Sequence, residues 1–240
     1  MGTIRCLKVI RTLGMPEVDL FASKVAILGI RRFLKGVFRL RPQAPRYKFT
    51  WDPSIVIKYL GNKYPNEKLT LLDLSRKLVT LLVLITGHRL QTIHLIKVEN
   101  IVFSAEGAQI LIPDEIKTSR PGNPQPCLHI PFYDKKEICV ASALIEYIER
   151  TAAIRTEVLN SLFITTSKPH RAVSKESFAR WVKHTLTAAG VDTSRFKPHS
   201  CRHASTSAAH RNGVPLDIIR STAGWSQSSN TFHKFYNRPP

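Results

Sequence analysis

The sequence is poor in acidic residues. It holds 17 Asp and Glu against 36 Lys and Arg, which gives a formal charge of +19. A compact chain with such an excess repels itself unless a polyanion normally lies against it. The imbalance predicts nucleic acid as that polyanion, with an anionic membrane as the alternative. We find no basic amphipathic stretch with a wide apolar face, so we expect no membrane partner.

The sequence also lacks paired cysteines and long apolar runs. Its four cysteines form no Cys-x-x-Cys motif, which argues against a zinc site and a disulfide framework and fits a reducing compartment. The longest apolar run, Leu78 to Ile85, is too short to cross a bilayer. Pro16, Glu17 and Asp19 interrupt the region where a signal peptide needs apolar residues. We therefore expect a soluble, intracellular protein.

What the chain does have is enough apolar residues for a sizeable core. Hydrophobic residues make up 43% of the 240. Residues 1 to about 41 look different from the rest, with a possible short helix from Leu20 to Leu34, and an extended linker with two prolines follows from Pro42 to Lys48. We expect an N-terminal segment and linker over 1–45 and one large domain over 46–240.

Within 46–240 the apolar pattern predicts mostly helices. Thr70 and Asp73 resemble a capping box that opens an apolar helix, and Gly87 is placed to end it. Three short apolar runs between turn residues predict an antiparallel sheet. The expected fold class is α+β, mainly α with a small antiparallel sheet, with strands at 101–103, 109–112 and 127–130 and helices at 51–59, 71–86, 88–95, 140–153, 174–189, 199–211 and 216–222.

Cleaving a nucleic-acid phosphodiester without a metal requires a small set of side chains. Forked guanidinium groups are the favoured donors to the charged phosphate oxygens. A tyrosine can store the phosphate as an ester, and a lysine or histidine can give a proton to the leaving sugar oxygen. The chain has many of each, so spacing and context must decide.

Arg89 and Lys117 are the first two candidates. Arg89 lies at the start of the helix after the most apolar one, where a charge cannot be core, although a surface arginine is common there. Lys117 lies on the loop between two predicted strands, from which a basic tip can reach a phosphate. A solvated turn is the plain alternative, and Arg120 competes for the same role.

His199 and Arg202 are three residues apart at a predicted helix start, so they share a face near a helix end that favours phosphate. A chain this rich in both residue types also produces such pairs by chance.

Trp225 follows a glycine, and Tyr236 lies in a phenylalanine-rich segment near the C-terminus. Core packing is the plain alternative for both. We expect Phe232 and Phe235 to supply that packing and leave Tyr236 on a different face.

The order of these residues is more specific than any one of them. An Arg, a hairpin Lys, His-x-x-Arg, Gly-Trp and a late Tyr resemble the tyrosine recombinase (phage integrase) family, over about 46–238. Residues 86–90 (Thr-Gly-His-Arg-Leu) resemble the family's first arginine box, and residues 198–203 (Pro-His-Ser-Cys-Arg-His) resemble its second. The resemblance implies the fold of the DNA breaking-rejoining catalytic cores.

The resemblance also implies a role for each candidate. Tyr236 is the expected nucleophile, Arg89 and Arg202 bind the scissile phosphate, Lys117 protonates the leaving 5′ oxygen, His199 assists proton transfer, and Trp225 braces the phosphate or packs beneath it. Further expected DNA contacts are Arg120, Lys197 and His203. The implied reaction is site-specific cleavage and rejoining of DNA strands through a 3′-phosphotyrosyl intermediate, with no metal, no nucleotide cofactor and no small-molecule substrate.

Some stretches are similar to the recombinases of DIRS-type retrotransposons and related eukaryotic mobile elements. These are residues 117–122, 213–216 and 235–237, and residues 16–23 resemble the RNase H region that precedes such recombinases. This similarity implies a mobile-element remnant or fusion and a nuclear location. Relatives work as homotetramers on duplex DNA, so we expect the same assembly.

The sequence also departs from the family. Thr92 stands where an acidic residue is usual, the interval from Trp225 to Tyr236 is slightly long, and residues 1–41 are too short for the usual N-terminal helical domain. Two alternatives stay open: a recombinase-derived DNA-binding protein without activity, and a type IB topoisomerase that relaxes supercoiled DNA. Read alone, Leu216 to Tyr236 also fits a helix-turn-helix.

Overall fold

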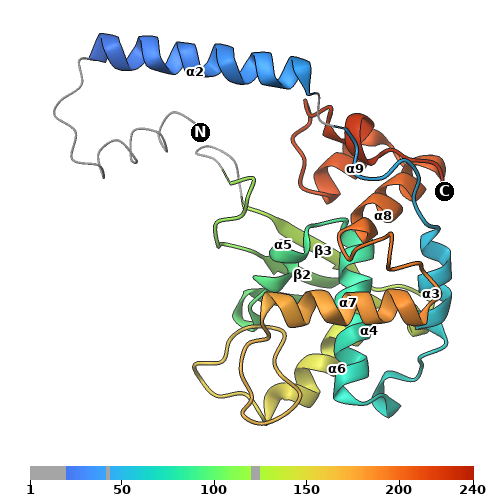
Figure 1. Ribbon diagram of the computed structural model, residues 1–240. Coiled ribbons are helices and arrows are strands. Elements are labelled where there is room, and N and C mark those ends of the chain that lie inside the picture. Colours follow the sequence, from blue (N-terminus) through green and yellow to red (C-terminus); the bar gives the residue numbers. More distant parts are fainter. Residues whose placement is uncertain (1–19, 42–43, 120–124) are drawn as a thin grey trace. The chain divides into compact units, whose positions relative to one another are not determined.

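The computed structural model describes residues 20–41, 44–119 and 125–240 (Figure 1). The chain divides into two compact units, Met1–Pro45 and Arg46–Pro240. Within the described ranges, no helix is long and apolar enough to cross a membrane. The candidate residues at described positions all belong to the larger unit.

The smaller unit contributes helix α2 (Leu20–Leu40), which is longer than the sequence suggested. In its second half, exposed large apolar side chains recur at helical spacing, at Ile30, Phe33, Leu34 and Val37. Four arginines and lysines lie between positions 31 and 39 of the same helix, which has no acidic residue. The expectation of no basic amphipathic stretch with a wide apolar face was therefore wrong. The apolar period becomes clear only when the helix continues past Leu34.

In the larger unit, α4 (Leu71–Thr86) is the central helix. It packs against α6 (Val140–Ala152), α7 (Lys175–Ala188) and α8 (Ser200–Arg211), and Figure 1 shows α7 crossing it. Its inward side chains fill the core because leucines recur there every four residues, at Leu74, Leu78 and Leu82, all buried. The remaining helices are α3 (Pro53–Gly61), α5 (Leu90–His94) and α9 (Leu216–Thr222).

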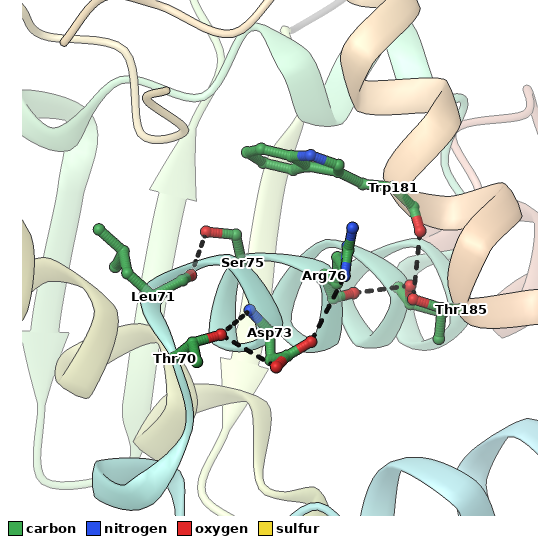
Figure 2. Close-up of polar contacts among 8 residues, drawn as sticks. Thr70, Leu71, Asp73, Ser75, Arg76, Trp181 and Thr185 are labelled. Carbon is green, nitrogen blue, oxygen red and sulfur yellow. Dashed lines mark hydrogen bonds and ion pairs between the residues drawn. The ribbon is translucent and has the colours of Figure 1, made fainter. Parts of the chain in front are cut away.

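Both ends of α4 are set by the residues that the sequence indicated. The Thr70 hydroxyl accepts a hydrogen bond from the Asp73 amide at 3.1 Å and donates one to the Asp73 carboxylate at 2.9 Å (Figure 2). Arg76 forms an ion pair with the same carboxylate at 3.5 Å. Gly87 ends the helix with a φ of +59°, which favours glycine. The predicted capping box and C-cap are confirmed.

The sheet is a three-stranded antiparallel meander in the order β1-β2-β3. Its strands are β1 (Ile101–Ser104), β2 (Gly107–Leu111) and β3 (Cys127–Pro131). Ala108 pairs with Ile130 and Ile110 with Leu128, and these four side chains are buried, so one face of the sheet joins the core. The predicted fold class, mainly helical with a small antiparallel sheet, is confirmed.

The chain end returns to the beginning of the larger unit. After α9, a π-helical turn, η4 (Phe232–Tyr236), carries the last tyrosine. The Thr50 amide then donates to the Pro239 carbonyl at 2.8 Å, which ties the C-terminal segment to the stretch before α3. This return places residues about 190 positions apart side by side, as the Arg238 Nε bond to the Tyr47 carbonyl also shows.

Candidate functional site

Arg202 lies in the first turn of α8 and is 1% exposed. Its Nη1 donates to the carbonyl of Gly87 at 2.6 Å and to that of Ala223 at 2.7 Å. These two carbonyls stand at the C-terminal ends of α4 and α9, so the guanidinium holds both helix ends together. Its Nε and Nη2 have no hydrogen-bond partner. The buried fork therefore keeps donors that an anion can use.

Two aromatic rings cover this guanidinium. The Arg202 Cζ lies 4.0 Å from the centre of the Trp225 ring and 5.3 Å from that of Tyr236. Both rings attract the cation through their π faces. Trp225 and Tyr236 belong to a small apolar cluster that also contains the buried Phe232. The indole Nε1 of Trp225 is buried without a partner, so a further donor lies close to the arginine.

This packing corrects one expectation about Tyr236. The side chain is 8% exposed and shares its cluster with Phe232 instead of lying on a different face. Residues four apart lie on the same side of a helical turn, so the spacing already indicated the shared face. Tyr236 is thus both a packed residue and a candidate nucleophile.

The charge on Arg202 has no acidic partner among the described residues. The ion pairs found there are Arg76–Asp73, Lys97–Asp114 and Arg150–Glu146. Burial, and then the charge of Arg89, lowers the pKa of Arg202 to about 10, while Tyr236 acts in the opposite direction. The group stays charged at neutral pH. A buried cation of this kind is stabilised further when an anion reaches it.

His199 places an imidazole beside the phenol. It is the N-cap residue of α8, and its Nε2 lies 3.3 Å from the Tyr236 hydroxyl oxygen. Burial is the main cause that lowers the pKa of His199 to about 4, followed by the charges of Arg202, Arg89, Arg46 and Lys117. The ring is neutral at pH 7 and can accept a proton from the phenol.

Two further candidates, Arg89 and Lys117, contribute to this lowering of the His199 pKa. Arg89 is half-buried at the N-cap of α5, and Lys117 is exposed on the connection between β2 and β3. The positive charges of both disfavour protonation of His199. Positive charges from α5, from α8 and from the connection between β2 and β3 therefore act on one imidazole.

The backbone at position 224 requires glycine, which explains the first residue of the Gly-Trp pair. A side chain at this position would meet the His88 ring at 2.7 Å, and its φ of +67° favours glycine in any case. Burial, followed by the charges of Arg202 and Arg89, lowers the pKa of His88 to about 4. His88 is thus a neutral ring packed against Gly224. The close packing of Gly224 on this ring is compatible with the neighbouring Trp225 lying 4.0 Å from the Arg202 guanidinium.

The other residues that were expected to contact DNA differ in their exposure. Lys197 is exposed, and its Nζ donates to the carbonyls of Thr193 and Ser194 at 3.4 and 3.1 Å. His203 is 3% exposed and lies under the Tyr236 ring. Arg120 lies outside the described residues. Within the described ranges no cluster of three or more His, Cys, Asp or Glu could hold a metal ion.

Sequence reasoning missed two residues that hold this site. Tyr47 contacts His203 edge-on, and its hydroxyl accepts from the Lys197 amide at 3.3 Å. Ser207 donates to the Tyr236 carbonyl at 2.6 Å. No local pattern marks either residue, because each contact joins positions far apart in the chain.

Comparisons with protein families and with known proteins both match integrases. The sequence pattern described as "Phage integrase family" matches residues 62–239. An integrase/recombinase XerD homolog of Selenomonas ruminantium is 27% identical over 213 residues, which cover 88% of this chain. The chain spans only 58% of that relative's length.

Two solved structures share the fold. The crystal structure of XerA recombinase superposes with a TM-score of 0.58 at 14% identity, covering 93% of this chain and 72% of that one. The XerH site-specific recombinase, bound to its difH substrate in a pre-cleavage complex, gives a TM-score of 0.58 at 15% identity, covering 80% of this chain and 50% of that one. With the sequence match extending over most of the larger unit, the chain belongs to the phage integrase family.

Proposed function

We propose that this chain binds duplex DNA and cleaves and rejoins its strands through a covalent bond between Tyr236 and a 3′ phosphate. One observation carries the proposal. The Tyr236 hydroxyl lies 3.3 Å from a neutral imidazole, and its ring centre lies 5.3 Å from a buried guanidinium with unused donors. A nucleophile, a proton acceptor and a phosphate-binding cation therefore come from η4 and α8 to one place.

The reaction follows from these positions. The Tyr236 oxygen attacks phosphorus, the bond from phosphorus to the 5′ oxygen breaks, and the phenol proton passes to His199. Lys117 gives a proton to the departing 5′ oxygen. Arg89 and Arg202 stabilise the charge that builds on the two non-bridging oxygens. The phosphotyrosyl ester conserves the energy of the broken bond, so the reverse attack by a 5′ hydroxyl reseals a strand.

Access to Arg202 requires movement of one of the two aromatic rings that cover it. The guanidinium is 1% exposed, because the Trp225 and Tyr236 rings lie over it. A DNA phosphate therefore reaches Nη2 only when one of these two rings shifts aside. The small cluster that holds both rings has few members, which lowers the cost of such a shift compared with opening the main core.

Family membership and the DNA-bound XerH relative support DNA as the substrate. The charge of +19 supports the same choice. We extend the proposal to Arg120 and Lys197 as contacts to the DNA backbone, and to a homotetramer that joins two duplexes. We also propose the division into an N-terminal segment over 1–45 and a catalytic domain over 46–240.

The finer origin is also part of the proposal. The stretches at 117–122, 213–216 and 235–237 support a recombinase of the DIRS type, which acts on DNA in a eukaryotic nucleus.

A suicide substrate tests the proposal. Duplex DNA nicked next to the cleavage position loses its short fragment after attack, so the protein remains attached to DNA. We expect a covalent complex that survives denaturing electrophoresis, and none with Tyr236→Phe. Tyr133→Phe is the matched control, because that tyrosine is exposed near the end of β3, and it should form the complex as wild type does.

The other outcomes separate the alternatives. A complex that persists in Tyr236→Phe contradicts the assigned nucleophile. Salt-sensitive DNA binding without any complex indicates an inactive DNA-binding protein. Relaxation of supercoiled DNA without a preferred site indicates topoisomerase activity.

A further inference from the structure

His203 is a buried histidine to which the reaction above gives no role. It follows Arg202 on α8 and is 3% exposed. Its ring stacks on the Tyr236 ring, with centroids 4.1 Å apart and planes inclined by 22°. Of the ring contacts of Tyr236 this one is the closest to parallel, since the planes of Trp225 and His199 are inclined to the tyrosine ring by 60° and 74°.

The His203 ring is itself held from other sides. Tyr47 meets it edge-on, with centroids 5.0 Å apart at 88°, and His199 meets it at 5.6 Å and 84°. Tyr47 in turn is anchored at both ends: its hydroxyl accepts from the Lys197 amide, and its carbonyl accepts from Arg238 Nε at 3.0 Å. A ring fixed in this way can act as a rigid surface for its neighbour.

The Tyr236 backbone has a separate support. Ser207 donates to the Tyr236 carbonyl at 2.6 Å and accepts from the Arg238 amide at 3.1 Å. Ser207 therefore fixes the position of the Tyr236 backbone, but not the direction in which the phenol points. The direction depends on what lies against the ring, and its flat neighbour is His203.

We propose that His203 is a positioning residue for the nucleophile: its ring sets the plane of the Tyr236 ring and so keeps the phenol oxygen within reach of His199. This inference rests on the proposed function and deepens it. Stacking needs a flat ring and not a particular nitrogen. Phenylalanine should therefore replace His203, and alanine should not.

The charge state of the ring agrees with this role. Burial is the main cause that lowers the pKa of His203 to about 3, followed by His199, Arg202, Arg238 and Arg46. A neutral ring can stack next to the Arg202 guanidinium without repelling it. Its Nδ1 is buried without a hydrogen-bond partner, so neither of the contacts described above depends on that nitrogen.

Single-turnover cleavage of two suicide substrates tests the proposal. One carries the natural 5′ oxygen at the scissile bond, and the other carries sulfur there, a leaving group that needs no proton. We expect His203→Ala to cleave both about 10- to 100-fold more slowly than wild type, because a misplaced nucleophile slows attack on either. His203→Phe should cleave both at nearly the wild-type rate.

Lys117→Ala is the matched control for chemistry. As the proposed general acid, it should be slow on the oxygen substrate and recover on the sulfur substrate. If the sulfur substrate rescues His203→Ala in the same way, His203 acts in proton transfer and the positioning role is wrong. Equal rates for His203→Ala and wild type also overturn it, as does a His203→Phe rate as low as that of His203→Ala.

A measurement without DNA separates this inference from the proposed function. Fluorotyrosine placed at position 236 reports the stacked ring through its ¹⁹F chemical shift. We expect His203→Phe to keep a ring-current shift and His203→Ala to move it toward the value of the unfolded chain. An unchanged shift in His203→Ala contradicts the stack. If wild type gives no covalent complex while the shift behaves as expected, the proposed function fails and the contact stands.

Discussion

The larger unit contains two buried regions with opposite chemistry. Around α4, leucines such as Leu78 are fully buried among other apolar side chains. Around Arg202, burial is as complete, yet the buried group is a cation held by two carbonyls and two aromatic faces. The first arrangement stabilises the fold outright, whereas the second tolerates a costly charge and leaves donors unused. The contrast separates a region that only stabilises the fold from one that also keeps donors for a ligand.

Replacement of Arg202 should show this contrast most strongly. Arg202→Lys loses the planar fork and cannot serve both carbonyls and a phosphate. We expect single-turnover cleavage of the suicide substrate to slow by about 10³-fold, equivalent to about 4 kcal/mol. Arg150→Lys is the control, because Arg150 also donates to a backbone carbonyl, at 2.8 Å, but on α6 away from the site. A loss below tenfold for Arg202→Lys would contradict its role in binding phosphate.

A cavity in the core should have the reverse effect. Leu78→Ala removes a fully buried side chain from α4 and should lower the free energy of unfolding by about 3 kcal/mol, measured by urea denaturation. Under conditions in which the variant is folded, its cleavage rate on bound DNA should remain close to wild type. If instead cleavage falls as far as in Arg202→Lys, the two regions are not separable.

Acid should lower the free energy of unfolding through the buried histidines of the site, whereas the aliphatic core has no group that titrates in this range. The pKa values of His88, His199 and His203 are lowered to about 4, 4 and 3 in the folded chain, mainly by burial. Between the ordinary histidine value and these values the folded state binds fewer protons than the unfolded state, so stability falls as pH falls. At pH 6 the three groups together should lower the free energy of unfolding by about 2.5 kcal/mol relative to pH 8.

A single variant tests the source of that pH dependence. His203→Phe should reduce the difference between pH 8 and pH 6 by about one third, because one of three groups no longer titrates. Leu78→Ala should lower stability at both pH values and leave the difference unchanged. A pH dependence that is the same in His203→Phe as in wild type would contradict the assignment.

Local signals made much of the fold predictable. Thr70, Asp73 and Gly87 gave both ends of α4, and the turn residues gave the three strands within one or two positions. The full extent of α2 was not predicted, because basic residues at positions 31, 32, 35 and 39 interrupt the apolar pattern in its second half. Caps and turns act over a few residues, which is why a sequence shows them directly.

The site was predictable only in its list of residues. The order from Arg89 to Tyr236 selected the candidates through a family resemblance, but it gave no contacts. The pairs Tyr47 with His203 and Ser207 with Tyr236 join distant positions, and no periodicity connects them. The stacked position of Tyr236 depends on these tertiary contacts, so it required coordinates.

The central claim is that the Tyr236 oxygen becomes bonded to DNA, and peptide mapping of the trapped complex tests it most directly. After nuclease digestion of the DNA and proteolysis of the protein, mass spectrometry locates the residual nucleotide. We predict a nucleotide on the peptide that contains Tyr236, bonded at its phenol oxygen. A nucleotide on any other residue, or trapped complex without a nucleotide on that peptide, would contradict the account.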